Sequence, residues 1–549
     1  MHNIKQCVLK TITKQWILTL LIIILCIFVI LSALLPPYIL GLIVDTLSTS
    51  SQLSFSIIVI YFLSLVANKV SISARDSVLV IFGQKISHTL RSAMMEHYTT
   101  TTAQLLSKQE SGEVVSRFIS DVDQIEQLFS AGIISLFADT LQMLSILYVI
   151  FQKTKGLFFI LSITLPCVFF YTRHVQKHML KAEKQNRQAI AEANAFIPET
   201  IHNILTIHNL NKQAYMEDKY TTLINKSYTA ISQTNFYDAI YSPTIQIIDA
   251  ITIAIVMALS ATRDPLVLSF FGMQAGTAVT ILNYIVQIFA PIENIGMEIQ
   301  TIQSAIACVQ RINTFLQTPQ ETKIISTQIA QTNHIITVNN ISFAYNKEYI
   351  LQNTSLTIDK GEHVTLVGRT GAGKSTLFKL ILGLYTPQTG SIQVCGQDPF
   401  TISPQQRRSI FGYVEQKFHP VIGTIRDQIT LYDTMISDEQ VNQALALTGL
   451  LQTVQFFPNK LDTLCSKELF SQGQWQNLSI ARAIVCDPPI LMFDEITADL
   501  DAEYEKHILE TLQHISKNKT ILSISHRQNE KSTRIIRVQG NRISNEKRA

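Results

Sequence analysis

Apolar positions are concentrated in the first part of the chain, where nearly all of the long, unbroken apolar runs precede residue 300. A helix needs about 20 predominantly apolar residues to cross a bilayer. The pattern predicts six membrane-spanning helices, at residues 16–35, 55–75, 131–151, 156–172, 239–259 and 276–290. We therefore expect residues 1–316 to form an all-helical transmembrane domain.

The remaining residues show a different pattern. Residues 317–333 are polar, rich in Thr and Gln and without apolar periodicity, which is typical of a linker. From His334 onward, short β-branched segments such as 364–367 and 490–493 alternate with helical patterns. This alternation predicts an α/β domain at residues 334–549.

Basic residues indicate which side of the membrane each segment occupies. Lys5, Lys10 and Lys14 precede the first span, and the long segments after the second and fourth spans are rich in Lys and Arg. The short loop at 48–54, after the first span, has none. Cytoplasmic segments carry an excess of such residues. The chain is therefore predicted to be a multi-pass protein of the cell (plasma or inner) membrane, with both the N-terminus and the α/β domain in the cytoplasm.

A glycine-rich segment between the apolar residues 364–367 and the helical pattern at 377–382 predicts a phosphate-binding loop. Successive backbone N–H groups and a helix N-terminus would face phosphate oxygens there. Lys374 is expected to reach the β- and γ-phosphates, and Ser375 to ligate Mg²⁺. A glycine-rich surface turn would explain neither the Lys-Ser ending nor the strand–helix context. The predicted ATP-binding residues of the loop are Gly368, Arg369, Thr370, Gly371, Ala372, Gly373, Lys374, Ser375 and Thr376.

Two acidic residues follow the apolar segment 490–493. Asp494 is expected near Mg²⁺, and Glu495 where it polarises the attacking water. An ordinary strand entering a turn has the same local pattern. The phosphate-binding loop upstream favours the catalytic interpretation, which makes the α/β domain a P-loop NTPase and the whole chain a multidomain membrane protein.

Composition excludes several other classes of protein. The net charge of +3 is small and dispersed, so no nucleic-acid partner is predicted. The seven cysteines are scattered and never form a Cys-x-x-Cys pair, so neither a metal site nor a disulfide framework is implied.

With these motifs the chain resembles the ABC transporter family, specifically exporter-type (type IV) half-transporters, in which six membrane helices precede one ATPase domain. The resemblance covers nearly the whole chain. Residues 469–474, Leu-Phe-Ser-Gln-Gly-Gln, are similar to the signature loop of the family. The resemblance implies that Ser471 and Gly473, with Gln474 beside them, contact ATP held by a second half-transporter.

Further motifs carry the same resemblance in the expected order. Tyr345 resembles the aromatic residue that stacks on adenine, and Gln416 the residue that touches Mg²⁺ and faces the membrane domain. Asp501 resembles a residue of the loop that pairs the two ATP sites, and His526 the switch histidine at the γ-phosphate. The resemblance thus implies catalytic roles for Glu495, His526 and Lys374 and Mg²⁺ contacts for Ser375, Gln416 and Asp494.

The signature loop departs from the family pattern at two positions. Gln472 replaces the usual first glycine, and Trp475 stands where Arg is common. In heterodimeric relatives one ATP site is often degenerate. Both a homodimer and the competent half of a heterodimer therefore stay open.

Two cytoplasmic segments resemble the coupling loops of exporters. One is 111–117, with Asp121 and Asp123 after it, and the other begins at residue 197 and continues to Ala214. The resemblance implies that short helices there transmit closure of the ATPase dimer to the membrane helices.

Two acidic residues, Asp139 and Asp249, fall within predicted spans, where carboxylates are costly and usually face a cavity or a partner. They either line a pathway that favours a cationic amphiphile or pair with Gln142, Gln246 or Asn283. The expected function is ATP-driven export of a hydrophobic or amphipathic substrate (drug, lipid or peptide) by alternating access of a dimer. The alternatives are an importer-like role with metal chelates, as half of a heterodimer, and a regulatory or sensor ATPase.

Overall fold

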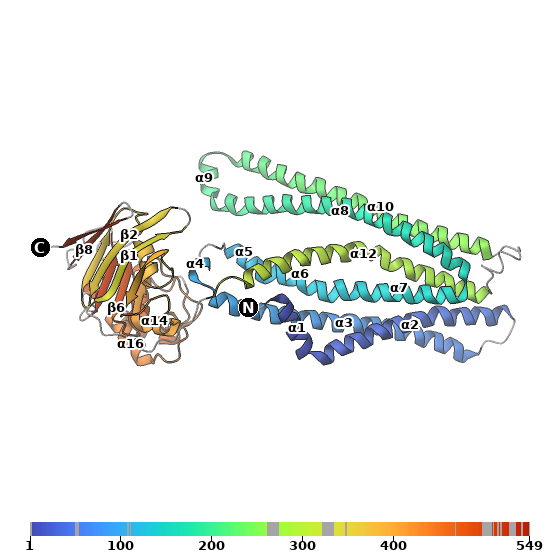
Figure 1. Cartoon of the computed structure of the whole chain (residues 1–549), viewed down its shortest axis with the longest axis horizontal. Coiled ribbons are helices and arrows are strands. Elements are labelled where there is room, and N and C mark those ends of the chain that lie inside the picture. Colours follow the sequence, from blue (N-terminus) through green and yellow to red (C-terminus); the bar gives the residue numbers. More distant parts are fainter. Residues whose placement is uncertain are drawn as a thin grey trace. The chain divides into compact units, whose positions relative to one another are not determined.

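The chain divides into two compact units, Met1–Thr99 with Gln109–Thr318, and Thr100–Lys108 with Pro319–Ala549. We call them the helical unit and the α/β unit; both are drawn in Figure 1. The structure, a computed structural model, describes residues 3–49, 54–106, 109, 111–260, 274–320, 334–345, 348–466, 468–496, 508, 510–512, 515, 519–525, 534–539 and 542–547. Asp501, His526 and most of the predicted linker, 321–333, lie outside these residues.

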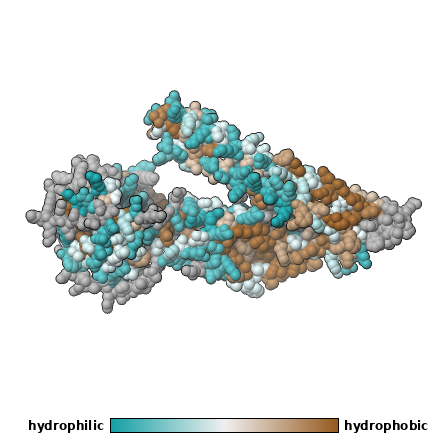
Figure 2. All heavy atoms as spheres, turned by 45° about the horizontal axis from the view of Figure 1, so that its top comes forward, coloured by the Kyte–Doolittle hydropathy of each residue, from teal (hydrophilic) through white to brown (hydrophobic). Residues whose placement is uncertain are grey.

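The helical unit is built mainly from long helices (Figure 1). Its elements are α1 (Ile4–Lys14), α2 (Trp16–Ser48), α3 (Phe55–Thr100), α5 (Ser111–Ser116), the π-helical turn η1 (Arg117–Asp121), α6 (Val122–Gln127), the π-helical turn η2 (Leu128–Gly132), α7 (Ile133–Lys153), α8 (Lys155–His202), α9 (Ile204–Asn209), α10 (Gln213–Ser260) and α12 (Ala275–Leu316). Within the described residues, six helical segments are long and apolar enough to cross a membrane. Figure 2 shows a broad hydrophobic surface over the part of this unit away from α9. The predicted fold class is confirmed for this half of the chain.

Several helices extend well past the apolar spans. α3, α8 and α10 contain 46, 48 and 48 residues, more than the roughly 20 that cross a bilayer. α8 and α10 pack side by side, and the short α9 joins their far ends (Figure 1). Beyond the apolar segments these helices contain many polar residues. They remain helical there because one face of each helix still packs against a neighbouring helix.

α2 passes through Pro36 and Pro37 without ending, although proline normally breaks a helix. Two hydroxyl groups of α12 donate hydrogen bonds to carbonyls beside these prolines: Thr280 Oγ1 to Pro37 O at 3.0 Å, and Tyr284 Oη to Leu34 O at 2.8 Å. These two hydrogen bonds join α12 to the turn of α2 that contains both prolines.

The same two helices approach each other closely at two glycines, Gly41 of α2 and Gly276 of α12. A Cβ atom added to Gly276 would lie 1.9 Å from Gly41 O, too close for any side chain. The Gly276 N–H donates to Asp45 Oδ1 at 2.6 Å. Small residues at such crossings let helix backbones pack tightly in membranes.

We expect Gly276→Val to lower the melting temperature of the purified chain in detergent, because valine has no space at this crossing. Overpacking typically costs about 1–3 kcal/mol. The control is Gly112→Val, since a Cβ atom at Gly112 would meet nothing within 4 Å. Intrinsic tryptophan fluorescence during heating measures the melting temperature of each variant. Equal melting temperatures for the two variants would contradict the close packing of α2 and α12.

The segment after α5 is fixed to α12 by an ion pair. The buried Asp121 of η1 accepts hydrogen bonds from Arg311 Nε at 2.9 Å and from its Nη2 atom at 2.5 Å. The hydrogen bond to Asp121 raises the pKa of Arg311. The two side chains form a bidentate pair, which sets orientation as well as distance. Asp121 thereby anchors the first segment that resembles a coupling loop.

Within the residues that the structure describes, the α/β unit contains two sheets. Its strands are β1 (His334–Ala344), β2 (Tyr349–Asp359), β3 (His363–Val367), β4 (Thr389–Val394), β5 (Phe411–Val414), β6 (Ile490–Asp494), β7 (Thr520–Ile524), β8 (Arg534–Gln539) and β9 (Arg542–Lys547). The order is β2-β1-β4 in the antiparallel sheet and β5-β6-β7-β3-β8-β9 in the larger one, which is parallel except for β9. Ligands of parallel sheets bind at the carboxyl ends of the strands. The predicted ATP-binding motifs lie at the carboxyl ends of β3 and β6.

The helices of this unit whose bounds the structure describes are short. They are α4 (Ala103–Leu106), α13 (Lys374–Ile381), α14 (Pro404–Ile410), α15 (Ile425–Thr430), α16 (Asp438–Leu447), α17 (Leu451–Phe456), the 3₁₀ turn η3 (Lys460–Asp462) and α18 (Gln472–Ile484). One hydrophobic core joins both sheets to α13, and a second lies among α15, α16, α17 and α18 and includes residues of β6. β6 therefore contributes to both cores and links the sheet to the helical subdomain formed by α15–α18.

Candidate ATP-binding site

The predicted phosphate-binding loop connects β3 to α13, as its sequence requires. Gly368 follows the last residue of β3, and a Cβ atom there would lie 2.3 Å from Val538 O of β8. Gly373, with φ of +98°, directly precedes α13 and packs so closely on Ile350 that a Cβ atom would approach it to 2.9 Å. Glycine alone fits both positions without strain. The loop therefore brings backbone N–H groups to the N-terminus of α13, where anions are favoured.

Lys374 is buried, with 5% of its surface exposed, and folds back over the loop. Its Nζ atom donates to Gly368 O at 2.9 Å and to Arg369 O at 3.1 Å. A buried ammonium group is stable only with such partners. The side chain thus holds a positive charge inside the curve of the phosphate-binding loop.

Ser375 and Asp494 meet at the carboxyl ends of β3 and β6. Ser375 Oγ donates to Asp494 Oδ1 at 3.3 Å, and Tyr413 Oη donates to Asp494 Oδ2 at 3.5 Å. Burial, together with the charge of Glu495, raises the pKa of the Asp494 carboxyl, while the two hydrogen bonds oppose this effect. A buried carboxylate and a neighbouring hydroxyl provide oxygen ligands that suit Mg²⁺. The charge of the metal would offset the cost of burying an ionised carboxylate.

Tyr413 is a member of the site that the sequence motifs did not indicate. Burial and the charge of Asp494 raise the pKa of its phenol, so the hydroxyl stays protonated and donates to Asp494. Tyr413 lies on β5, which pairs with β6 beside Asp494. The motif that singled out Gln416, three residues further along the chain, did not indicate this contact.

Glu495 directly follows β6 in a left-handed backbone conformation, with φ of +50°. Its N–H donates to Ile524 O at 3.2 Å, and its Oε2 atom accepts a hydrogen bond from Gln416 Nε2 at 3.1 Å. Left-handed conformations of residues other than glycine are uncommon, and they concentrate at functional sites. The structure therefore brings together Gln416 and Glu495, which are far apart in the sequence.

Tyr345 lies beside Thr376, the last residue of the phosphate-binding loop. Its hydroxyl is 3.4 Å from Thr376 Oγ1, and its ring packs edge-on against Phe343 and Tyr385. These contacts fix the ring beside α13. Tyr345 is therefore positioned near the loop, as expected of a residue that stacks on a nucleotide base.

The signature segment forms the N-terminal cap of α18. Ser471 Oγ accepts from Gln474 N at 3.4 Å, and Gln474 Oε1 accepts from Ser471 N at 2.9 Å, which is a capping box. Gly473 lies buried in the first turn. Ser471 and Gln474 are thus hydrogen-bonded to each other. They lie at the N-terminus of α18, a helix of 13 residues.

Trp475, the unusual residue of the signature segment, packs in an aromatic cluster with Phe418 and Phe470. Its ring stacks on Phe418 at 5.3 Å and lies edge-on to Phe470 at 5.2 Å. The Arg482 guanidinium lies 4.2 Å from the centre of the Phe418 ring. The cluster joins α18 to the segment that carries Gln416, so Trp475 has a packing role that the sequence alone did not reveal.

Arg482 also makes several hydrogen bonds within the helical subdomain. Its Nε atom donates to Gln428 O at 2.5 Å and its Nη1 atom to His419 O at 3.3 Å. Burial and the neighbouring charge of Arg408 lower the pKa of Arg482 to about 10, which leaves the side chain charged at neutral pH. Only a planar guanidinium can stack on a ring and donate in several directions at once.

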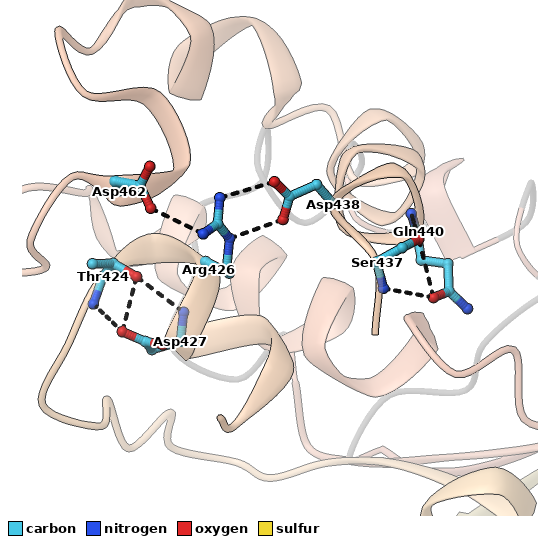
Figure 3. A network of polar contacts seen from close by, with 7 residues as sticks. All are labelled: Thr424, Arg426, Asp427, Ser437, Asp438, Gln440 and Asp462. Carbon is cyan, nitrogen blue, oxygen red and sulfur yellow. Dashed lines mark hydrogen bonds and ion pairs between the residues drawn. The ribbon is translucent and has the colours of Figure 1, made fainter. Parts of the chain in front are cut away.

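A second arginine of this subdomain lies in a more exposed network, shown in Figure 3. Arg426 forms ion pairs with Asp438 at 2.9 Å and with Asp462 at 3.1 Å, and so connects α15, α16 and η3. The side chains of Asp438 and Asp462 are 58% and 67% exposed. Such exposed ion pairs contribute roughly 0–1 kcal/mol. Capping boxes at Thr424 and Ser437 fix the two helix starts beside them (Figure 3).

These two arginines give a matched stability test. We expect Arg482→Lys to lower the free energy of unfolding by about 1–3 kcal/mol, because hydrogen bonds to buried carbonyls lose their donors. Arg426→Lys, which changes the same chemical group at the exposed network, is expected to cost less than about 1 kcal/mol. Chemical unfolding of the full chain checks both values. Equal destabilisation would contradict the importance of the hydrogen bonds that Arg482 donates.

Comparisons with known proteins agree with this architecture. The model of the ABC transporter transmembrane region matches residues 19–292, and the ABC transporter model matches residues 351–498. Together they cover most of the chain, which belongs to the ABC transporter family. It is a multi-pass protein of the inner membrane whose cytoplasmic ATPase domain binds ATP and drives export.

Similar proteins occur in several bacteria. The ATP-dependent lipid A-core flippase of Francisella tularensis subsp. tularensis (strain SCHU S4 / Schu 4) is 27% identical over 84% of this chain and 77% of its own length. The ATP-dependent lipid A-core flippase of Desulfotalea psychrophila is 27% identical over 84% of this chain and 82% of its own length. The uncharacterized ABC transporter ATP-binding protein YknV of Bacillus subtilis is 25% identical over 87% and 78%. A solved bacterial Atm1-family ABC exporter with ATP bound has a TM-score of 0.79 at 20% identity, over 96% of this chain and 94% of its own. This likeness concerns the fold.

Proposed function

We propose that the chain is one half of a dimeric exporter that moves an amphipathic molecule out of the cytoplasm by alternating access. The observation that carries the proposal is a cavity of about 410 Å³ between α7, α8 and α12. Its lining is largely apolar and includes Met143, Leu165, Phe169 and Phe170, with Asp139 as its acidic residue. An apolar cavity with a few polar groups is the usual form of a small-molecule site. The lipid A-core flippase activity named for the relatives supports an amphipathic substrate.

Charged residues near this cavity favour a cationic or neutral head group. Asp139 lies close enough to Arg75 and Asp76 of α3 to interact with their charges. Arg75 and Asp76 form an ion pair with each other at 2.9 Å. The three side chains together therefore carry one excess negative charge when all are ionised. These three side chains together therefore attract a cation and repel a phosphate.

Asp139→Asn with Asp249→Asn is the variant that tests this substrate class. We expect it to weaken binding of ethidium, used as a cationic probe, by about tenfold, because contacts to a charged group contribute roughly 1.5–3 kcal/mol. Fluorescence titration of the chain in lipid nanodiscs measures the affinity. The charge-matched control is Glu217→Gln with Asp218→Asn, two exposed residues of α10.

Unchanged affinity and unchanged transport in the double variant would remove the pathway role. The two carboxylates would then have the structural role of pairing with Gln142, Gln246 or Asn283. A weakened affinity in the control variant as well would indicate a general effect of surface charge. Only a loss confined to Asp139 and Asp249 supports the cationic substrate.

At the ATP site, we propose that Lys374 binds the β- and γ-phosphates and Tyr345 stacks on adenine. Gly368, Arg369, Thr370, Gly371, Ala372, Gly373 and Thr376 complete the phosphate-binding loop. Ser375 and Asp494 would hold Mg²⁺ with Gln416, and the metal would neutralise phosphate charge. Glu495 would accept the proton of the attacking water, and its bond from Gln416 orients the carboxylate for that role.

The second subunit would complete each site. Ser471, Gly473 and Gln474 would contact ATP on the partner, with Asp501 and His526 contributing at the dimer interface. The short helix α9 and its surroundings expose Ile201, Leu205 and Leu210, which are 67%, 77% and 63% accessible. Apolar side chains gathered at the end of a hairpin are typical of a docking surface. We propose that they contact the partner's ATPase domain and couple ATP-driven closure to the membrane helices.

A further inference from the structure

A basic pocket lies between α1 and α3 and shares no lining residue with the ATP site or with the cavity beside Asp139. It has a volume of about 570 Å³. α1 contributes Lys10 and Lys14, and α3 contributes Lys85 and His88. The pocket is therefore lined by two helices and carries positive charge from both of them.

The wall formed by α1 is held firmly in place. Its apolar face buries Ile4 and Cys7 in a core shared with α3 and α12. Ile4 N donates to Asn313 Oδ1 of α12 at 3.1 Å, and a capping box between Asn3 and Gln6 closes the first turn. α1 is thus a packed amphipathic helix, which leaves its lysines to face the pocket.

The positive charges of the pocket are not neutralised by the protein. Within the described residues, Lys10, Lys14 and Lys85 form no ion pair. Their side chains are exposed, and Glu96 is the acidic residue among those that line the pocket. Three lysines face one carboxylate, so the pocket has an excess of positive charge even when His88 is neutral.

The pocket also lies at the cytoplasmic boundary of the membrane. Gln15, which lines it, is the C-cap that follows α1, and the apolar helix α2 begins at the next residue, Trp16. The Trp16 and Ile17 side chains are 63% and 65% exposed. Tryptophan is enriched at the level of lipid head groups. The lysines are therefore placed where the head groups of the inner leaflet end.

We propose that this pocket binds the phosphate-bearing head group of an anionic lipid of the cytoplasmic leaflet. Basic pockets between helices at this depth suit such head groups, and lysine ammonium groups donate to phosphate from several directions. The neighbouring apolar surface of α2 accommodates the acyl chains. The lipid joins α1 to α3, and this binding does not depend on the transported substrate.

Native mass spectrometry of the full chain in detergent tests the proposal with dioleoylphosphatidylglycerol and dioleoylphosphatidylcholine as probes. We expect wild type to retain phosphatidylglycerol in preference to phosphatidylcholine. The variant Lys10→Gln/Lys14→Gln/Lys85→Gln is expected to bind phosphatidylglycerol about a hundredfold more weakly, since the effect is roughly fivefold per lysine. Arginine at the same three positions is expected to restore binding.

The control variant Lys212→Gln/Lys360→Gln/Lys460→Gln removes the same charge from exposed lysines elsewhere and should bind as wild type does. Equal loss in this control, or equal retention of the two lipids by wild type, would overturn the proposal. Displacement of phosphatidylglycerol by millimolar inorganic phosphate would also overturn it, because the site would then bind a free anion. A failure of these measurements leaves ATP-driven export untouched, since none of them depends on ATP.

Discussion

Glu495→Gln is expected to reduce steady-state ATP hydrolysis by the full chain about a hundredfold or more while ATP binding persists. A positioned general base contributes roughly 10²–10⁴-fold to a rate. Glutamine keeps the size of the side chain and its bond with Gln416 but cannot accept a proton. Phosphate release by the chain reconstituted in lipid measures the effect.

The control for this substitution is Glu439→Gln, an exposed position at the start of α16. It should hydrolyse ATP at the wild-type rate. Wild-type turnover by Glu495→Gln would show that another group acts as the base. Negligible turnover by a folded, ATP-binding wild type would instead indicate an obligate second subunit, which matches the open choice between homodimer and heterodimer.

Lys374→Gln is expected to weaken ATP binding itself, by about tenfold to a hundredfold. Contacts between a charged donor and its partner contribute roughly 1.5–3 kcal/mol. The same substitution also removes the two hydrogen bonds to Gly368 O and Arg369 O that shape the loop. Binding of a fluorescent ATP analogue to the full chain measures the loss.

Lys360→Gln is the matched control, because Lys360 is an exposed residue of the turn between β2 and β3. It should bind the analogue as wild type does. Wild-type affinity in Lys374→Gln would contradict the phosphate-binding role. The contrast with Glu495→Gln separates the two steps, since one variant fails to bind ATP and the other fails to hydrolyse it.

Features with a local signal were predicted from the sequence. Apolar runs are contiguous, so the six membrane helices could be recognised, and the spacing of the phosphate-binding loop requires a strand before it and a helix after it. Asp494 and Glu495 followed from their position after an apolar strand. These signals depend on residues close together in the chain, where geometry restricts the alternatives.

Packing contacts between distant residues were not predicted. The crossing of Gly41 with Gly276 and the stacking of Phe418 on Trp475 depend on the tertiary arrangement of helices. Trp475 was interpreted only as a departure from a family pattern, whereas the structure gives it partners. The second span was predicted to end at residue 75, whereas α3 continues to Thr100 and carries Arg75 and Asp76 within it.

Vectorial transport tests the central claim most directly. The chain is reconstituted in phosphatidylethanolamine–phosphatidylglycerol vesicles with its ATPase domain outside, and three fluorescent probes are followed: ethidium, and labelled phosphatidylcholine and phosphatidylglycerol. We predict that at least one probe moves away from the ATPase side with ATP in wild type, and that Glu495→Gln moves none. Robust ATP hydrolysis with no probe moved would favour a regulatory ATPase, and movement toward the ATPase side would favour an importer. Either result would contradict export.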